Sequence, residues 1–134
     1  MKDTIIEKLQ GAGVTPTQQR IEIAQILFAK PQHLSAEQVL NLVNVDRARV
    51  SKATVYNTLG LFAEKGLVKE VIVDPSKVFY DSNVSNHHHF YLLDSGELMD
   101  IETDELRIEN IPTLPEGTVT DGIDVVIRVR NKTA

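Results

Sequence analysis

The stretch SKATVYNTLGLFAEKGLVKEVIVDPSKVFYD, residues 51–81, changes its hydrophobic period at Gly66. Before Gly66 the apolar side chains recur at helical spacing, and Ser51 is a residue type that commonly caps a helix N-terminus. After Gly66 the pattern changes to the period of a strand over residues 67–73 and 77–81, and the Asp-Pro-Ser between them is typical of a turn. The stretch therefore predicts a helix ended by a glycine and followed by a two-stranded hairpin.

Three helices are predicted upstream of this stretch. The first carries a short apolar stripe that ends at Gly11. The second begins within TPTQ at residues 15–18, where Thr15 offers an N-cap, the proline the first helical position and the glutamine a capping box, and Pro31 ends it. The third opens at the capping box SAEQ, residues 35–38. Helices in this order before a hairpin indicate a winged helix-turn-helix, which is a DNA-binding fold.

The helix over residues 52–65 has two different faces. At 100° per residue, Val55, Leu59 and Phe62 fall on one side, which we expect to pack in the core. The opposite side combines small and polar residues: Lys52, Ala53, Tyr56, Asn57 and Gly60. In a major groove, lysine can neutralise a phosphate and asparagine can read a base edge. Ordinary solvent-exposed helices have similar faces, so the DNA-binding interpretation depends on the neighbouring helices and hairpin.

The second half of the chain is predicted to be rich in β-structure. Residues 87–93 and 97–101 have strand character, and Asp-Ser-Gly at residues 94–96 marks a turn between them. A final strand is predicted over residues 123–130, where Ile and Val alternate with mostly polar residues. Pro112, Pro115 and Gly117 indicate a loop before it.

Three of the four histidines stand together as His87, His88 and His89. On an extended segment, side chains alternate between faces, so His87 and His89 share one face and His88 points to the other. Asp81 and Asp100 flank the run, and the chain has no cysteine. Imidazole and carboxylate ligands suit zinc, iron or manganese, so the run indicates a metal site. The alternative is a solvated histidine-rich loop.

Charge is distributed unevenly over the 134 residues. Residues 1–80 carry ten Lys or Arg and eight Asp or Glu, whereas residues 81–134 carry four and eleven. The first part is compatible with a DNA-facing domain, and the acidic second part attracts cations. No apolar run approaches the roughly 18 residues of a membrane span, and no secretory signal is evident. We therefore expect a cytoplasmic protein without a membrane partner.

Several motifs together resemble the ferric uptake regulator family over nearly the whole chain. They are TPTQQR at residues 15–20, HLSAEQV at 33–39, ATVYNTL at 53–59 and the histidine run. The resemblance implies an α+β protein: a winged-helix DNA-binding domain, residues 1–82, then a small α/β dimerisation and metal-sensing domain rich in β-structure, residues 83–134. It also implies a homodimeric repressor that binds double-stranded DNA at AT-rich palindromic operators.

The resemblance further implies functional residues. One regulatory divalent metal ion per subunit, Fe2+, Mn2+ or Zn2+, would be held by His33, Asp81, His87, His89 and Asp100. His33 receives this role from the resemblance alone, because a lone histidine near a helix start is ordinarily a capping or surface residue. A metal shared by the two domains would favour the arrangement that binds DNA. The expected DNA contacts are Arg20 and Lys52 on phosphates, Tyr56 on thymine methyl groups, Asn57 on a base edge, and Thr54.

The chain departs from the family pattern at its cysteines. Leu92 and Ser95 stand where most members have a Cys-x-x-Cys pair, so no structural four-cysteine zinc is expected. A cysteine-free chain with three histidines resembles the iron response regulator branch, in which haem at His87, His88 and His89 would release DNA. The five-ligand set also resembles peroxide-sensing members, and spacing alone does not separate these branches.

Two other functions remain as alternatives. A zinc hydrolase would use His87, His89 and an aspartate as ligands, with Glu97 or Glu102 as the base. The chain lacks a His-Glu-x-x-His helix, and a hydrolase gives the winged helix no purpose, so we expect no enzyme. The other alternative is a metal-independent winged-helix regulator whose histidines are surface residues.

Overall fold

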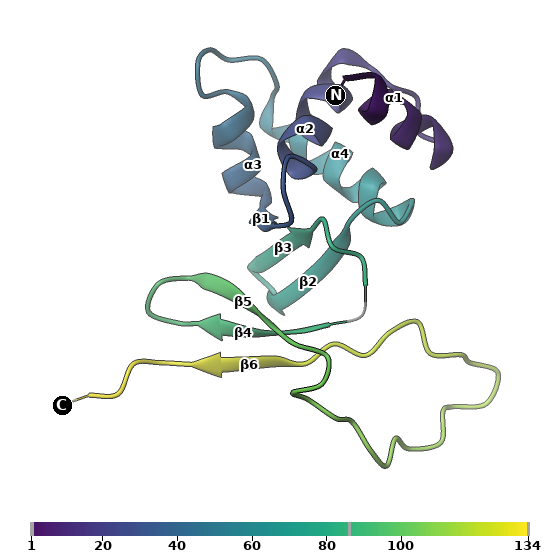
Figure 1. Ribbon diagram of the computed structural model, residues 1–134, viewed down its shortest axis with the longest axis vertical. Coiled ribbons are helices and arrows are strands. Elements are labelled where there is room, and N and C mark those ends of the chain that lie inside the picture. The colour runs from purple at the N-terminus through teal and green to yellow at the C-terminus, as the bar shows by residue number, and fades with distance from the viewer. Residues whose placement is uncertain (1, 86, 134) are drawn as a thin grey trace. The chain divides into compact units, whose positions relative to one another are not determined.

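Apart from one three-residue strand, helices precede Gly66, and within the described residues only strands follow it, as the change of period predicts (Figure 1). The computed structural model describes residues 2–85 and 87–133. It divides into two compact units, Met1–Val84 and Ser85–Ala134, a boundary two residues beyond the one expected from the sequence. The helices all belong to the first unit: α1 (Lys2–Gly11), α2 (Gln18–Leu27), α3 (Ala36–Val43) and α4 (Lys52–Glu64).

The helix ends follow from local side chains, with one correction. Ser35 and Gln38 form the predicted capping box of α3, and Ser51 caps α4 by accepting a hydrogen bond from the backbone N–H of Thr54. Thr15 was predicted to cap α2, and this is wrong. Thr17 is the N-cap: its backbone is extended and its hydroxyl accepts from the N–H of Arg20 at 3.3 Å. The helix therefore begins after the proline rather than with it.

A three-stranded antiparallel sheet completes the first unit. The hairpin consists of β2 (Lys69–Asp74) and β3 (Lys77–Asp81), and Gly66, with φ of 76°, allows the turn from α4 toward it. The sheet order is β1-β3-β2, because a short strand β1 (His33–Ser35) pairs with the far edge of β3. Strand β1 was not predicted from the sequence. Its three residues are too few to show a period.

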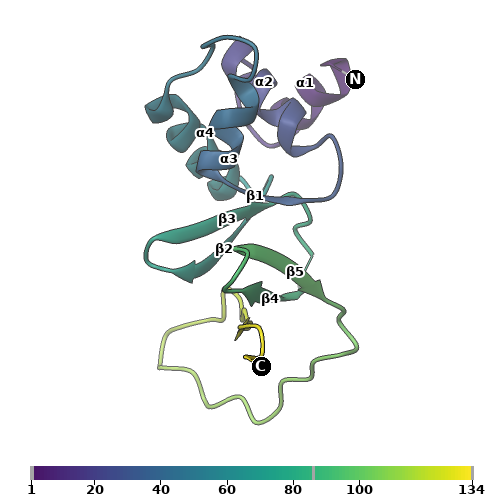
Figure 2. The ribbon, with the colours of Figure 1, turned by 90° about the vertical axis from the view of Figure 1, so that its left-hand side faces the viewer.

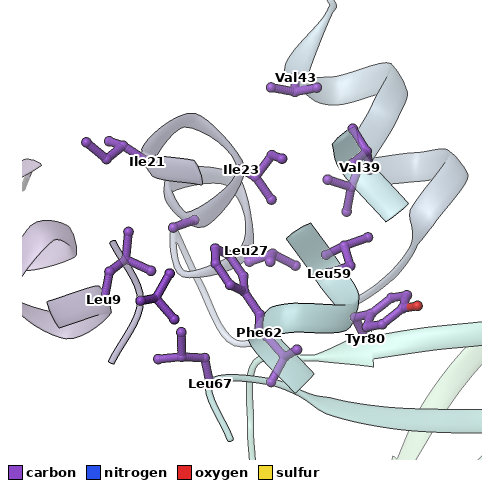
Figure 3. Close-up of a cluster of buried hydrophobic side chains, with 14 of the residues drawn as sticks. Leu9, Ile21, Ile23, Leu27, Val39, Val43, Leu59, Phe62, Leu67 and Tyr80 are labelled. Atoms are coloured by element: carbon purple, nitrogen blue, oxygen red, sulfur yellow. The ribbon is translucent and has the colours of Figure 1, made fainter. Parts of the chain in front are cut away.

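The hydrophobic core of the first unit lies between the helices and this sheet (Figure 3). Val55, Leu59 and Phe62 are fully buried, which confirms the predicted inner face of α4. They meet Leu9 and Leu27 from α1 and α2 in the same cluster. Burial of this face fixes which side of α4 remains open to solvent, because a helix cannot rotate without exposing its apolar stripe.

The second unit is a smaller sheet with the order β5-β4-β6. Strands β4 (His88–Leu92) and β5 (Glu97–Ile101) form an antiparallel hairpin, whereas β6 (Val126–Val129) runs parallel to β4. Residues 102–125 connect the end of β5 to the start of β6 as an extended loop, which carries the chain from one edge of β4 to the other (Figures 1 and 2).

Two expectations for the second unit need correction. Within residues 87–133 the structure contains no helix, so the helical part of the α+β fold belongs to the first unit. Prolines at 112 and 115 lie in the loop before β6, and proline disfavours the interior of a helix. The last strand was predicted from residue 123 and begins at Val126. Among residues 2–85 and 87–133, no helix combines the length and apolarity that crossing a bilayer requires.

Candidate metal centre and DNA-facing helix

His87 and His89 converge on one carboxylate in the second unit. His89 lies on β4 directly opposite Asp100 of β5, and the rings of His87 and His89 have centroids 4.6 Å apart. The Nε2 atoms of His87 and His89 are 3.4 Å and 3.3 Å from Oδ1 of Asp100. Both imidazoles are buried while Asp100 is exposed. The prediction that His87 and His89 share a face is confirmed.

The distances within this group fit a shared cation. Ligand atoms held at about 2.0–2.1 Å by a tetrahedral metal are about 3.3–3.4 Å from one another. A direct N–H···O hydrogen bond usually has a donor–acceptor distance of about 2.7–3.2 Å. The two Nε2–Oδ1 distances of 3.4 Å and 3.3 Å match the first geometry and exceed the second. The donor set, two imidazoles and a carboxylate, is one that zinc, iron and manganese accept.

The tautomer of His87 also supports a cation between its Nε2 atom and Asp100. Its Nδ1 lies 2.8 Å from the backbone carbonyl oxygen of Ser85, which can only accept a hydrogen bond, so Nδ1 carries a proton and donates. In the neutral form of this tautomer the lone pair is at Nε2, which faces the carboxylate oxygen of Asp100. A cation stabilises two lone pairs that face each other in this way. A ligand histidine oriented through its second nitrogen is the usual arrangement around protein-bound metals.

His88 takes no part in this group. Its Nδ1 accepts a hydrogen bond at 3.0 Å from the backbone N–H of Val125, the residue before β6. Alternation along β4 places His88 on the other face from His89, as predicted. The three histidines therefore do not form one cluster, and haem binding by the run remains a prediction that the structure does not test.

His33 and Asp81 are neighbours in the first unit. They are register partners across β1 and β3, and three hydrogen bonds between Gln32 and Ser82 extend this pairing. The Ser82 N–H and hydroxyl donate to the Gln32 carbonyl at 3.0 Å and 3.1 Å, and the Gln32 N–H donates to the Ser82 hydroxyl at 3.1 Å. Asp81 is buried. The unpredicted strand β1 thus brings His33 beside Asp81, residues far apart in the sequence. Of the implied ligands, His33 and Asp81 belong to the first unit, and His87, His89 and Asp100 belong to the second.

The open face of α4 has the residues that were predicted for it. Lys52, Ala53, Tyr56, Asn57 and Gly60 are all exposed. The ammonium of Lys52 lies 5.8 Å from the centre of the Tyr56 ring, and Thr54 accepts a hydrogen bond from the Ser51 hydroxyl at 2.9 Å. Arg20 lies on α2, where its guanidinium donates to the Thr15 carbonyl at 2.9 Å.

The loop between α3 and α4, which the sequence pattern did not indicate, leads into the first turn of α4. The side-chain oxygen of Asn44 accepts from the N–H groups of Arg49 and Val50, and its amide nitrogen donates to the Val50 carbonyl. Arg49 in turn pairs with Asp46 at 2.7 Å and with Glu22 of α2 at 3.2 Å. The hydrogen bond from Arg49 lowers the pKa of Asp46 to about 2. These contacts join α2, the loop and the start of α4.

A winged-helix unit with an open polar helix face, followed by a small β unit in which two buried histidines approach one exposed carboxylate, defines a metal-responsive DNA-binding regulator. The sequence matches the model of the ferric uptake regulator family over residues 11–119. The chain belongs to this family, whose members are metal-dependent transcriptional repressors rather than enzymes.

Individual relatives agree with this assignment. The chain is 33% identical to a peroxide-responsive repressor of Staphylococcus aureus over 102 residues, which are 76% of this chain and 69% of the relative. It is 27% identical to the ferric uptake regulator of Pseudomonas aeruginosa, solved with manganese, with a TM-score of 0.70 over 95% of this chain and 97% of the other. The Vibrio cholerae ferric uptake regulator has the same fold at 22% identity, with a TM-score of 0.70 over 94% and 98% of the two chains.

Proposed function

We propose that this chain is a cytoplasmic, homodimeric repressor that binds DNA when one divalent metal ion, Fe2+, Mn2+ or Zn2+, occupies each subunit. The observation that carries the proposal is the approach of two histidine Nε2 atoms to one oxygen of Asp100, at 3.4 Å and 3.3 Å. Support comes from the related Pseudomonas aeruginosa protein, which was solved with manganese. In this proposal His87, His89 and Asp100 hold a regulatory metal rather than the catalytic zinc of a hydrolase, in keeping with the family.

The full ligand set that we propose is His33, Asp81, His87, His89 and Asp100. Each unit supplies part of it: the first two residues are register partners in the first unit, and the other three converge in the second. A metal that takes ligands from both units binds most tightly when the units approach each other. The metal therefore increases the population of the arrangement in which the units approach each other, and its difference in affinity between the two arrangements sets the size of the shift.

The DNA contacts that we propose are Arg20, Lys52, Thr54, Tyr56 and Asn57, on an AT-rich palindrome. Lys52 and Tyr56 form a pair on the exposed face of α4, which suits a helix that lies in a major groove. A homodimer presents two such helices related by twofold symmetry, so a palindromic site with half-sites about one helical turn apart is the matching target.

The test uses a duplex selected from a random pool for binding in the presence of Mn(II). Fluorescence anisotropy at fixed salt measures the affinity of the metal-stripped protein and of the protein with added Mn(II). We expect at least a tenfold gain with Mn(II) in the wild type and in His88→Ala, whose side chain lies outside the group. The gain should be lost in the His87→Ala, His89→Ala double variant. Equal binding with and without metal in the wild type would refute the co-repressor mechanism.

A second candidate signal is peroxide, because the chain is 33% identical to a peroxide-responsive repressor. Protein loaded with Fe(II) and protein loaded with Mn(II) should then differ after treatment with hydrogen peroxide. Loss of DNA binding together with an added oxygen on a histidine-containing peptide, only in the Fe(II) form, supports peroxide sensing. Unchanged DNA binding by the Fe(II) form leaves metal concentration itself as the signal, and release by added haem would instead support haem sensing.

A further inference from the structure

A polar pocket lies between the N-terminus of α2 and the outer side of α4. Its volume is about 300 Å³, and it is lined by Thr17, Gln19, Arg20, Thr54, Asn57, Thr58 and Leu61. We propose that this pocket holds one phosphate of the DNA backbone and thereby fixes the position of α4 on the duplex. The proposal rests on the DNA-binding function proposed above and names the chemical group that this part of the surface binds.

Thr58 is the residue that points to a ligand. It is only 5% exposed, yet it lines the pocket. Within the described part of the chain, its hydroxyl makes no hydrogen bond, and no fully buried side-chain nitrogen or oxygen lacks a partner. The hydroxyl oxygen is therefore accessible from the pocket. A polar group that is so nearly buried normally makes a hydrogen bond. We therefore expect a ligand in the pocket to supply the hydrogen-bond partner of the Thr58 hydroxyl.

The pocket also favours negative charge. The first N–H groups of an α-helix have no partner within the helix, and its N-terminus carries a partial positive charge. Thr17 caps the ten-residue α2 at this end, and Arg20 is held at the pocket by its hydrogen bond to the Thr15 carbonyl. No aspartate or glutamate is among the lining residues. The carboxylate of Glu22 on the same helix is instead engaged by Arg49 and Gln18.

These features together favour an anionic phosphate over a neutral base edge as the ligand. Arg20, Thr58 and the helix N-terminus all offer donors to an anionic oxygen. Asn57 was expected on a base edge, but it lines the same pocket, and this proposal assigns its amide to the phosphate instead. Phosphate contacts fix register without reading sequence. Substitutions here should therefore weaken binding to every duplex alike.

The first test compares Thr58→Val, which keeps the shape and removes the hydroxyl, with Thr58→Ser, which keeps the hydroxyl. Full-length Mn(II)-loaded protein is titrated into the selected duplex and into a scrambled duplex of equal length. We expect about a tenfold loss of affinity for both duplexes with Thr58→Val, the size of one hydrogen bond to a charged group, and nearly wild-type binding with Thr58→Ser. Asn57→Ala should likewise lose affinity for both. Arg20→Gln should reduce the salt dependence by about one counterion.

The second test changes the DNA and so does not depend on folding of a variant. A scan that replaces each backbone phosphate by an uncharged methylphosphonate should find one position per half-site that weakens wild-type binding and adds no further loss in Thr58→Val. Absence of such a position would overturn the proposal, as would a Thr58→Val protein that binds like wild type. Tight binding of inorganic phosphate to the DNA-free protein, in competition with the duplex, would instead assign the pocket to a free anion. If wild-type protein shows no Mn(II)-dependent DNA binding in these titrations, the proposed function fails instead.

Discussion

Hydrogen bonding at His87 decides which of its nitrogens is available to a cation. The carbonyl of Ser85 accepts from Nδ1, which leaves Nε2 directed at Asp100. The sequence predicted that His87 and His89 share a face, because alternation is a local property of extended chain. It could not predict the role of the Ser85 carbonyl, since every residue has a backbone oxygen and only the fold determines where it points.

Asp100 is the residue whose charge the proposed site needs most directly. Asp100→Asn keeps the size of the side chain but removes the anionic oxygen that both imidazoles approach. We expect Mn(II) affinity, measured by equilibrium dialysis at constant pH, to fall by at least about tenfold. Glu97→Gln, at the start of the same strand and also exposed, removes an equal charge and should change the affinity little. Equal losses in the two variants would mean that the ion is attracted by the acidic surface in general.

At the scale of elements, the sequence predicted long periodic segments and missed short ones. The four helices and the two hairpins were predicted because capping residues and period changes mark them locally. Strand β1 has three residues, and its pairing with β3 depends on contacts between distant segments. For the same reason, His33 beside Asp81 could be suggested by family resemblance but not by the local pattern.

The loop between α3 and α4 should contribute measurably to the stability of the folded protein. Asn44→Ala removes the acceptor for two backbone N–H groups and the donor for one carbonyl. We expect it to lower the free energy of unfolding by roughly 2 kcal/mol, measured by urea denaturation. Asn44→Asp keeps the acceptor oxygen and should lose less. If the two variants are equally unstable, the donor to Val50 is the important bond and not the acceptor.

At the scale of the whole molecule, the proposed metal site depends on ligands that come from both units. Two residues in the first unit and three in the second are proposed to bind one ion, and residues 82–86 connect the two groups. A ligand that binds only the native state stabilises it by about 2.7 kcal/mol at a hundredfold excess over its dissociation constant. If one ion engages both units, this stabilisation must be measurable in each of them.

Hydrogen exchange can detect this coupling without DNA. In the wild type, saturating Mn(II) should slow exchange of amides in β1 and β3 of the first unit as well as in β4 and β5 of the second. In a His33→Ala, Asp81→Asn double variant the ion would retain His87, His89 and Asp100, and protection should be confined to β4 and β5. His88→Ala serves as the control, because that side chain contacts the Val125 N–H and not the ligand group, so it should keep protection in both units.

Protection of the second unit alone in the wild type would contradict a shared ion. The metal would then have to control DNA binding through the second unit by itself, because no ligand would connect it to the unit that carries α4.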